Sequence, residues 1–184
     1  MAARPDERLL TADEFLGIEF GPDLKAELDN GVIRMMGGGS YAHSRVQMNL
    51  YRFFGTALRG SGCRPHGSDM AVRVSDSSIR YPDLTIDCGT RAAEERDRVL
   101  RDPRVVVEVL SPTTRDNDLG VKLAEYRLLA SVDAIAFVDP DEEVLAITRR
   151  TAGGGWTDIE FRRRDLDLPS LDLVVPYAEI FARD

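Results

Sequence analysis

The sequence has 184 residues, of which 43% are hydrophobic and 30% are charged, and its formal net charge at pH 7 is −8. This length and composition fit one domain with a normal hydrophobic core, so we expect a single domain over residues 1–184. The acidic balance excludes a chain-wide basic surface for nucleic acid, so any such contact must be local or assisted by a metal ion.

The chain carries no signal for a membrane or for secretion. Residues 1–10 lack the apolar core of a signal peptide, and no run of about 18 apolar residues predicts a membrane-spanning helix. The two cysteines, Cys63 and Cys88, are far apart and form no CxxC motif. We therefore predict reduced thiols in a cytoplasmic protein.

The N-terminal region predicts a short helix and then a hairpin. Thr11 and Glu14 have the spacing of a capping box, which begins a helix through about Leu16. The turn signal Asp29-Asn-Gly31 stands between alternating flanks, so residues 26–36 are expected to form a β-hairpin.

A glycine run separates this hairpin from a long helix. Gly37–Gly39 is either a flexible connector or a phosphate-binding loop, and the connector is favoured because no Lys-Ser/Thr follows. Ser40 is a suitable N-cap for an amphipathic helix to about Arg59. His43 falls in the first turn of that helix, where a surface or capping role is the simplest interpretation.

The next region alternates between strands and turns. Residues 70–74 and 81–87 have strand-like patterns, and Asp83 stands at the start of the second strand, after a Tyr-Pro pair. Residues 90–104 combine five arginines with four acidic residues. This segment is expected to be an exposed connection, with a binding loop as the alternative.

The apolar run 104–112 carries a carboxylate near its end. β-Branched residues dominate the run and prolines bound it, which predicts a strand buried on both faces. Because side chains alternate along a strand, Glu108 shares a face with Val106 and Leu110. A carboxylate there is costly unless cations or donors meet it, so Glu108 marks a functional site or a buried salt bridge to an arginine.

A helix and another strand follow. Asp116 or Asn117 can cap a helix to about Leu129, which Gly120 weakens. Lys122 and Tyr126 lie one turn apart on this helix and share a face. Together with an apolar strand at 134–138, the segment 104–138 predicts a right-handed parallel crossover.

The C-terminal region has weaker signals. Residues 144–148 and 157–161 resemble a hairpin across the glycines at 153–155, and the acidic stretch 139–143 is expected to be a solvated turn. An extended segment at 165–176 and a helical turn at 177–182 close the chain. The full order of elements predicts an α/β fold with a mixed central sheet flanked by helices.

The candidate chemistry rests on two carboxylates and a lysine. The sequence lacks a P-loop, an HExxH motif, a GxSxG elbow and a Rossmann fingerprint, and two histidines are too few for a zinc site with these cysteines. Asp83 and Glu108 on adjacent strands would repel unless one is protonated or a cation lies between them. Oxygen ligands suit Mg²⁺ or Mn²⁺, and the Val109 carbonyl could supply a third protein ligand.

The ordered motifs resemble a known family. Pro82-Asp83, Glu108 in VVVEVLSP, the helix 118–126 and a strand ending at Pro140 together resemble the Uma2-type family of restriction endonucleases, in the PD-(D/E)XK nuclease superfamily. The resemblance extends over most of the chain, from the hairpin at residue 26 to the C-terminal hairpin. It implies a restriction-endonuclease-like core at about 25–140 and metal-dependent hydrolysis of DNA phosphodiester bonds.

The resemblance also implies roles for individual residues. Asp83 and Glu108 would hold Mg²⁺, and Lys122 would replace the superfamily lysine, whose usual position is occupied here by Leu110. Glu27 resembles the additional acidic residue that an N-terminal element supplies in many such nucleases, where it could bind a second metal ion or a metal-bound water.

Several assignments keep alternatives. Water activated by the metal would attack the phosphate while Lys122 orients the water and offsets charge, although a plain counter-ion role is the alternative. His43 matches a histidine often seen in the family but receives no role. Tyr126 could line the site, with core packing as the favoured interpretation.

Other functions remain open at this stage. A catalytically inactive module of the same fold that binds nucleic acid or assembles with partners agrees with the net charge, and a hydrolase of small phosphorylated molecules is a third possibility. Local arginines, Arg80, Arg101, Arg104 and Arg115, could offset the acidic charge near DNA. By analogy with nucleases that cut both strands, we expect a homodimer.

Overall fold

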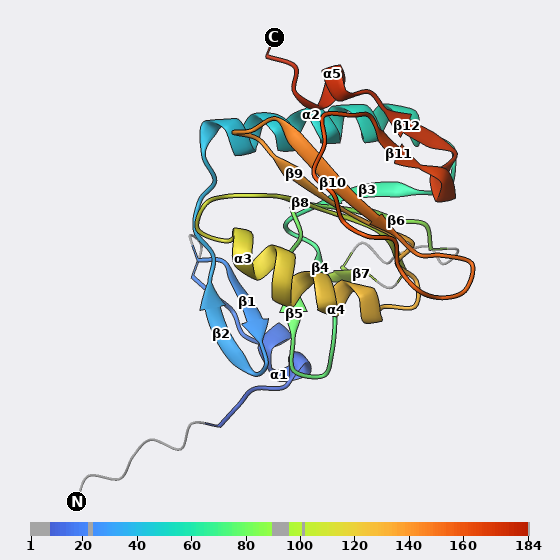
Figure 1. Cartoon of the computed structure of the whole chain (residues 1–184). Coiled ribbons are helices and arrows are strands. Elements are labelled where there is room, and N and C mark those ends of the chain that lie inside the picture. The colour runs from blue at the N-terminus through green and yellow to red at the C-terminus, as the bar shows by residue number, and fades with distance from the viewer. Residues whose placement is uncertain (1–7, 22–23, 90–95, 101, 184) are drawn as a thin grey trace, which may run out of the picture.

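The computed structural model describes residues 8–21, 24–89, 96–100 and 102–183, and two five-stranded sheets form its centre (Figure 1). The larger strands form one sheet in the order β10 (Val144–Arg149), β9 (Ala134–Asp139), β8 (Pro103–Val109), β6 (Leu84–Asp87) and β3 (Arg64–Gly67). The second sheet has the order β2 (Val32–Met35), β1 (Ala26–Asp29), β5 (Ile79–Arg80), β4 (Ala71–Arg73) and β7 (Val99–Leu100).

The predicted α/β class is confirmed, although the strands are divided between two sheets instead of one. The division arises because the N-terminal hairpin pairs with β5 through Leu28 and Ile79, whereas β6 pairs with β8. Since β8 is antiparallel to β6 and parallel to β9, its sheet is mixed. The crossover predicted over 104–138 therefore joins parallel strands.

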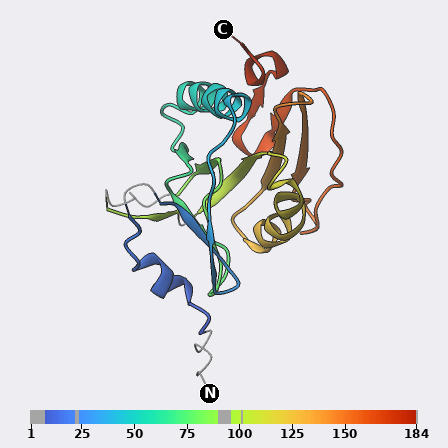
Figure 2. The same cartoon turned by 90° about the vertical axis from the view of Figure 1, so that its left-hand side faces the viewer.

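Helices cover both faces of the β8 sheet (Figures 1 and 2). On one face lies α2 (Tyr41–Ala57), whose buried residues Val46, Leu50 and Phe54 recur every four positions and pack against Val105, Val107 and Val109. The opposite face of β8 packs against the helical segment after it. The alternation predicted for the Glu108 strand therefore places Glu108 beneath that second helical segment.

The second helical segment is not one regular helix. It consists of α3 (Arg115–Asn117), the π-helix η1 (Asp118–Lys122) and α4 (Leu123–Leu128). The wider π turn coincides with Gly120, the position that weakens an α-helix. Both Asp118 and Lys122 are buried as a result, so one turn directs two charged side chains into the protein.

The N-terminal elements follow their local signals. The helix α1 (Ala12–Leu16) begins at the Thr11–Glu14 capping box. In the turn between β1 and β2, Asn30 and Gly31 have φ angles of 47° and 82°, the left-handed conformations that this hairpin turn requires. The Ser40 hydroxyl caps α2 by accepting the His43 amide at 3.2 Å.

The C-terminal region departs from its prediction. Residues 157–161 do not form a strand, and the isolated bridges Leu145↔Arg162 and Arg150↔Trp156 lie on either side of this segment. Side chains replace the expected ladder, since the Thr148 hydroxyl donates to the Thr157 carbonyl at 2.6 Å. The segment predicted as extended forms a hairpin, which is made of β11 (Leu166–Leu168), the 3-10 helix η2 (Pro169–Leu171) and β12 (Leu173–Val175), and α5 (Tyr177–Ile180) follows.

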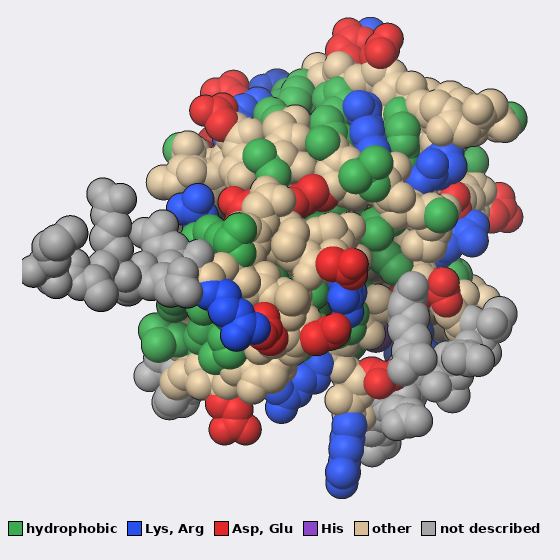
Figure 3. Space-filling view, turned by 90° about the horizontal axis from the view of Figure 1, so that it is seen from below, with side chains coloured by type: hydrophobic (Ala, Val, Ile, Leu, Met, Phe, Trp, Pro, Cys, Tyr) green, Lys and Arg blue, Asp and Glu red, His purple; other side chains and the backbone are tan. Residues whose placement is uncertain are grey.

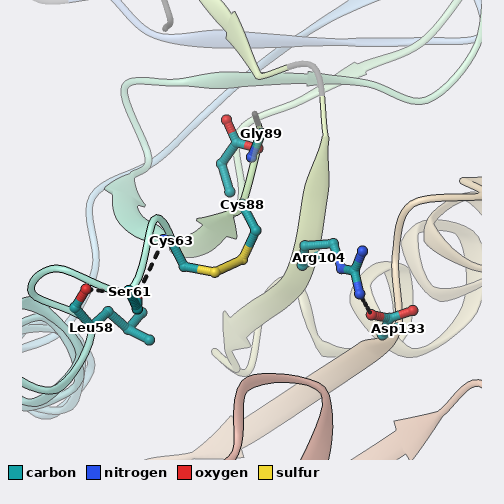
Figure 4. Close-up of a disulfide and its surroundings, with 8 residues drawn as sticks. Leu58, Ser61, Cys63, Cys88, Gly89, Arg104 and Asp133 are labelled. Carbon is teal, nitrogen blue, oxygen red and sulfur yellow. Dashed lines mark hydrogen bonds and ion pairs between the residues drawn. A yellow bond between two sulfur atoms is a disulfide. The ribbon is translucent and has the colours of Figure 1, made fainter. Parts of the chain in front are cut away.

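A disulfide joins Cys63 to Cys88, so the prediction of reduced thiols is wrong (Figure 4). The cause is strand register: Arg64 on β3 is paired with Asp87 on β6, which places the two cysteines opposite each other one residue further out. Separation along the sequence could not reveal this pairing. The bond ties the segment after α2 to the end of β6, the strand that follows Asp83.

Removing the disulfide is expected to destabilise the protein. The two cysteines are separated by 25 residues, and a crosslink that closes a loop of that length lowers the conformational entropy of the unfolded chain. This loss raises the free energy of the unfolded state by about 3 kcal/mol. The double variant Cys63→Ser/Cys88→Ser should therefore lose about that much in urea unfolding. A thiol reductant should weaken the unmodified protein by a similar amount and leave the double variant unchanged. Equal unfolding free energies for the oxidised and reduced protein would contradict this prediction.

None of the helices in the described ranges has both the length and the apolar character required to cross a membrane.

Candidate active site

Asp83 and Glu108 meet at one end of the β6–β8 pair. The register Leu84↔Val107 makes Asp83 and Glu108 the next opposed residues of these antiparallel strands. The Val109 amide donates to Asp83 Oδ2 at 2.8 Å, which holds this carboxylate at the end of β8. The negative charge of Asp83 also raises the pKa of Glu108, as expected for carboxylates at short range.

Glu108 is 3% exposed, and its side-chain contacts with Tyr126 and Lys122 both fall on Oε1. The Tyr126 hydroxyl donates to Oε1 at 2.6 Å, and Lys122 Nζ lies 3.3 Å from the same atom. Among the described residues, Oε2 receives no hydrogen bond. Burial, opposed by the Lys122 charge and reinforced by nearby carboxylates, raises the pKa of Glu108 to about 8. A second cation beside this carboxylate would favour its ionised form.

Lys122 lies among three carboxylates. Its ammonium is 3.2 Å from Glu27 Oε1, 3.3 Å from Glu108 Oε1 and 3.3 Å from Asp118 Oδ1. Burial favours the neutral amine, but these charges outweigh it and raise the pKa of Lys122. The lysine is therefore held in its charged form at the inner wall of the site.

Asp83 also contacts one face of α2. His43 Nε2 is 3.2 Å from Asp83 Oδ2, Gln47 Nε2 donates to the Asp83 carbonyl at 3.0 Å, and the Tyr51 hydroxyl donates to the same carbonyl at 2.8 Å. The hydrogen bond to Asp83, opposed by burial, raises the pKa of His43. His43 therefore lies beside the candidate site, whereas the sequence analysis gave it no role.

Gly39 lies close to the His43 side chain. A Cβ at Gly39 would lie 2.8 Å from His43 Nδ1, so a larger residue would displace the imidazole. The segment Gly37–Gly39 was predicted to be a simple connector, and in the structure it also forms part of the wall of the cleft.

Glu27 joins the site to a second buried ion-pair network. Besides Lys122, Glu27 lies 3.5 Å from Arg80, whose guanidinium also pairs with Asp29 at 2.9 Å and Glu125 at 2.6 Å. Arg80 is 1% exposed. This arginine is therefore an internal counter-ion and cannot contact DNA as predicted.

The other arginines suggested for DNA are differently placed. Arg104 pairs with Asp133 at 2.5 Å (Figure 4), and Arg115 pairs with Asp139. Arg101 lies outside the described residues. On the face seen in Figure 3, basic and acidic side chains are interspersed, and the coloured residues show no continuous basic band there. Because Arg104 and Arg115 are each paired with an aspartate, they do not favour strong contact with DNA phosphates.

Sequence reasoning missed Asp118, Gln47 and Tyr51. Asp118 is 2% exposed, and its Oδ1 has no hydrogen-bond partner in the described part of the chain apart from the Lys122 ion pair. The spacing of Asp118 and Lys122, four residues apart on a predicted helix, was an available signal. Gln47 and Tyr51 share a face of α2 with His43, but no local signal directed that face toward Asp83.

These groups line a cleft of about 700 Å³. Its walls come from the glycine segment, the start of α2, the ends of β6 and β8, the loop after β8 and η1. Glu27, His43, Asp83, Glu108, Val109 and Lys122 all line this cleft, and Tyr126 lies behind Glu108 as a fully buried donor. The predicted residues therefore converge, although Tyr126 contributes from the core.

The residues fit a hard cation only in part. Within the described ranges, no three or more His, Cys, Asp and Glu side chains are arranged as a ready metal site, because Lys122 and His43 already pair with the carboxylates. The donor set is nevertheless suited to Mg²⁺, since Asp83 and Glu108 offer oxygen atoms at the cleft and Glu108 Oε2 is not hydrogen-bonded.

A mixed α/β fold with a carboxylate pair at the end of neighbouring strands, and a lysine from the following helix, defines a nuclease-like architecture. The Uma2 family profile, described as "Putative restriction endonuclease", matches residues 12–180. The chain therefore belongs to the Uma2 family.

Individual proteins are also similar to this chain. An uncharacterised Synechocystis protein, slr1290, is 29% identical over 89% of this chain and 87% of its own length. A Chlamydia muridarum deoxyuridine 5′-triphosphate nucleotidohydrolase is 30% identical over 50% of this chain and 62% of its own length. The fold matches an Anabaena variabilis crystal structure described as "a putative nuclease belonging to DUF820", with a TM-score of 0.75, 18% identity and coverage of 94% of this chain and 98% of that one.

Proposed function

We propose that this protein is a metal-dependent endodeoxyribonuclease. The observation that carries the proposal is Glu108, a buried carboxylate whose Oε2 accepts no hydrogen bond from the described residues, placed beside Asp83 and in contact with the Lys122 ammonium. A buried carboxylate with a strongly raised pKa in a cleft is typical of a functional site. Family membership supports phosphodiester hydrolysis as the reaction.

The residues have distinct proposed roles. Asp83 and Glu108 would hold Mg²⁺ or Mn²⁺, with the Val109 carbonyl as a further ligand, and the ion would polarise the phosphate and lower the pKa of a bound water. Lys122 would orient the attacking water and offset charge on the phosphate. The Tyr126 hydroxyl donates to Oε1 of Glu108, which would leave Oε2 available to the metal ion.

The remaining contacts prepare this arrangement. Glu27 and Asp118 retain the Lys122 ammonium when Glu108 engages a cation, since each lies within 3.3 Å of it. His43 would have to release Asp83 Oδ2 or share it with the cation. We extend the proposal to a homodimer, in which each protomer would cut one strand.

Metal binding tests this proposal directly. At a Mg²⁺ concentration 100 times its Kd, the unfolding free energy of the unmodified protein should rise by about 2.7 kcal/mol. Asp83→Asn should lose this stabilisation. Calorimetric titration with Mg²⁺ and with Mn²⁺ should likewise show tighter metal binding by the unmodified protein than by Asp83→Asn. Asp141→Asn, at an exposed turn residue, serves as the matched control. Full retention of metal binding by Asp83→Asn would refute the assignment.

A hydrolase of small phosphorylated molecules is the second candidate. It is favoured by the similarity to the Chlamydia nucleotidohydrolase, which extends over half of this chain. Incubation of the protein with plasmid DNA and, separately, with deoxyuridine triphosphate in the same Mg²⁺ buffer separates the two activities. Nicked plasmid with intact nucleotide supports the nuclease, whereas pyrophosphate release with intact plasmid supports the alternative.

A further inference from the structure

A second hollow of about 350 Å³ adjoins the main cleft. Tyr81 lines both the hollow and the cleft, and Asp83, which lines the cleft, follows two residues further along the chain. We call it the Tyr81 hollow, and its lining residues are Phe15, Leu16, Ile18, Glu19, Phe20, Tyr81 and Arg98. Its volume is at the lower end of the range for small-molecule sites, about 300–1,000 Å³.

Three of the residues that line this hollow, Phe15, Phe20 and Tyr81, are aromatic. Phe15 on α1 is 2% exposed and lies 5.5 Å from the ring of Phe20, centroid to centroid. The Tyr81 amide donates to Glu27 Oε1 at 3.0 Å, and Lys25 Nζ lies 5.7 Å from the centre of the Tyr81 ring. Since Lys25 and Glu27 both line the main cleft, Tyr81 is fixed from that side, while its side chain also borders the hollow.

The Tyr81 hollow contains polar groups as well as aromatic ones. Within the described ranges, neither the Tyr81 hydroxyl nor the Arg98 guanidinium has a hydrogen bond or ion pair, although Arg98 is close enough to influence the pKa of Tyr81. Arg98 and Glu19 are both exposed. The hollow therefore combines aromatic lining residues with exposed donor and acceptor groups.

We propose that the Tyr81 hollow binds one unstacked nucleobase of the polynucleotide whose phosphate occupies the main cleft. The inference rests on the proposed function and adds a substrate preference to it. A base presents a flat aromatic face to Phe20 and Tyr81 and hydrogen-bonding edges to Arg98 and Glu19. A phosphate alone suits the hollow less well, because aromatic rings and the Glu19 carboxylate surround it.

This arrangement favours a strand whose bases are unpaired near the cut. A base inside a duplex is stacked and paired, so a duplex must first unstack one nucleotide to place its base in the hollow, which costs a few kcal/mol and least where the base is unpaired. Single-stranded or mismatched DNA should therefore bind more tightly than a perfect duplex.

An abasic scan tests the nucleobase subsite. Single-stranded oligonucleotides, each lacking one base at a successive position, are titrated by fluorescence anisotropy in Ca²⁺. One position should matter, with an affinity about tenfold lower when its base is missing, as expected for loss of a stacked base. Phe20→Ala should weaken binding of the intact strand about tenfold and abolish the effect of that abasic position.

Controls distinguish this result from unfolding. Phe20→Leu keeps apolar bulk without an aromatic face and should resemble Phe20→Ala in binding while melting like the unmodified protein. Arg98→Ala should weaken binding of the intact strand, whereas Arg96→Ala, at a nearby exposed arginine outside the hollow, should not. An unchanged abasic profile in the Phe20 variants, or equal affinity for duplex and single strand, would overturn the proposal.

The same experiment separates this inference from the nuclease proposal. If the unmodified protein cleaves DNA but no abasic position matters, the nucleobase subsite is wrong and the nuclease assignment is retained. If the unmodified protein neither binds nor cleaves polynucleotides with Mg²⁺, both proposals are wrong.

Discussion

Replacement of Glu108 by glutamine is expected to reduce Mg²⁺-dependent DNA cleavage by about a thousandfold or more and to leave the fold intact. Such a loss corresponds to about 4 kcal/mol of transition-state stabilisation, a reasonable value for a metal ligand. Glutamine keeps the oxygen that accepts the Tyr126 hydrogen bond but removes the negative charge required by a cation. Lys122 keeps Glu27 and Asp118 as counter-ions.

Plasmid nicking and thermal unfolding of the Glu108→Gln variant together check this expectation. The melting temperature should change by no more than about 2–4 °C, which corresponds to about 1 kcal/mol for a domain of this size, because a buried carboxyl whose pKa is raised to about 8 is replaced by an amide of equal size. Glu142→Gln, at an exposed acidic residue, should leave both quantities unchanged. Persistent cleavage by a folded Glu108→Gln variant would eliminate Glu108 as a metal ligand.

Replacement of Arg80 by methionine is expected to destabilise the protein by about 3–5 kcal/mol. Removing one partner of a buried ion pair leaves the other charges without compensation, and here three carboxylates, Glu27, Asp29 and Glu125, lose a shared guanidinium. Chemical denaturation of the variant provides the measurement.

Arg73→Met is the matched control for Arg80→Met. Arg73 also pairs with two carboxylates, Asp13 and Asp76, but its side chain is 36% exposed and both partners are exposed. A pair of this kind contributes at most about 1 kcal/mol. If the two arginine variants lost the same stability, burial of the Arg80 network would not be the cause.

Local sequence determined the elements that carry the candidate site. The β-branched run with Glu108 became the buried strand β8, and its alternation set which face Glu108 shares with Val106. Asn30-Gly31 formed the hairpin turn because these residues tolerate positive φ. These features depend on backbone conformation and on the period of apolar residues, and residues close together in the sequence determine both.

Local sequence did not determine which charged side chains pair inside the protein. From the sequence Arg80 resembles a surface arginine, yet three carboxylates from distant segments enclose it. The spacing of Asp118 and Lys122 predicts that they are neighbours on a helix, but it does not predict that both are buried. Likewise, the segment 157–161 alternates like a strand but contacts β10 mainly through side chains. Long-range neighbours decide these outcomes, because a charge is stable inside the protein only where its partners also arrive.

The amino-acid sequence alone determined the α/β class, the principal helices and strands, and the three residues Asp83, Glu108 and Lys122 that meet in the cleft. Only the tertiary structure decided the division into two sheets, the Cys63–Cys88 disulfide and the three-carboxylate environment of Lys122. The physical reason is that periodicity and turn chemistry act between neighbours in the chain, whereas strand register and charge compensation depend on which distant segments pack together.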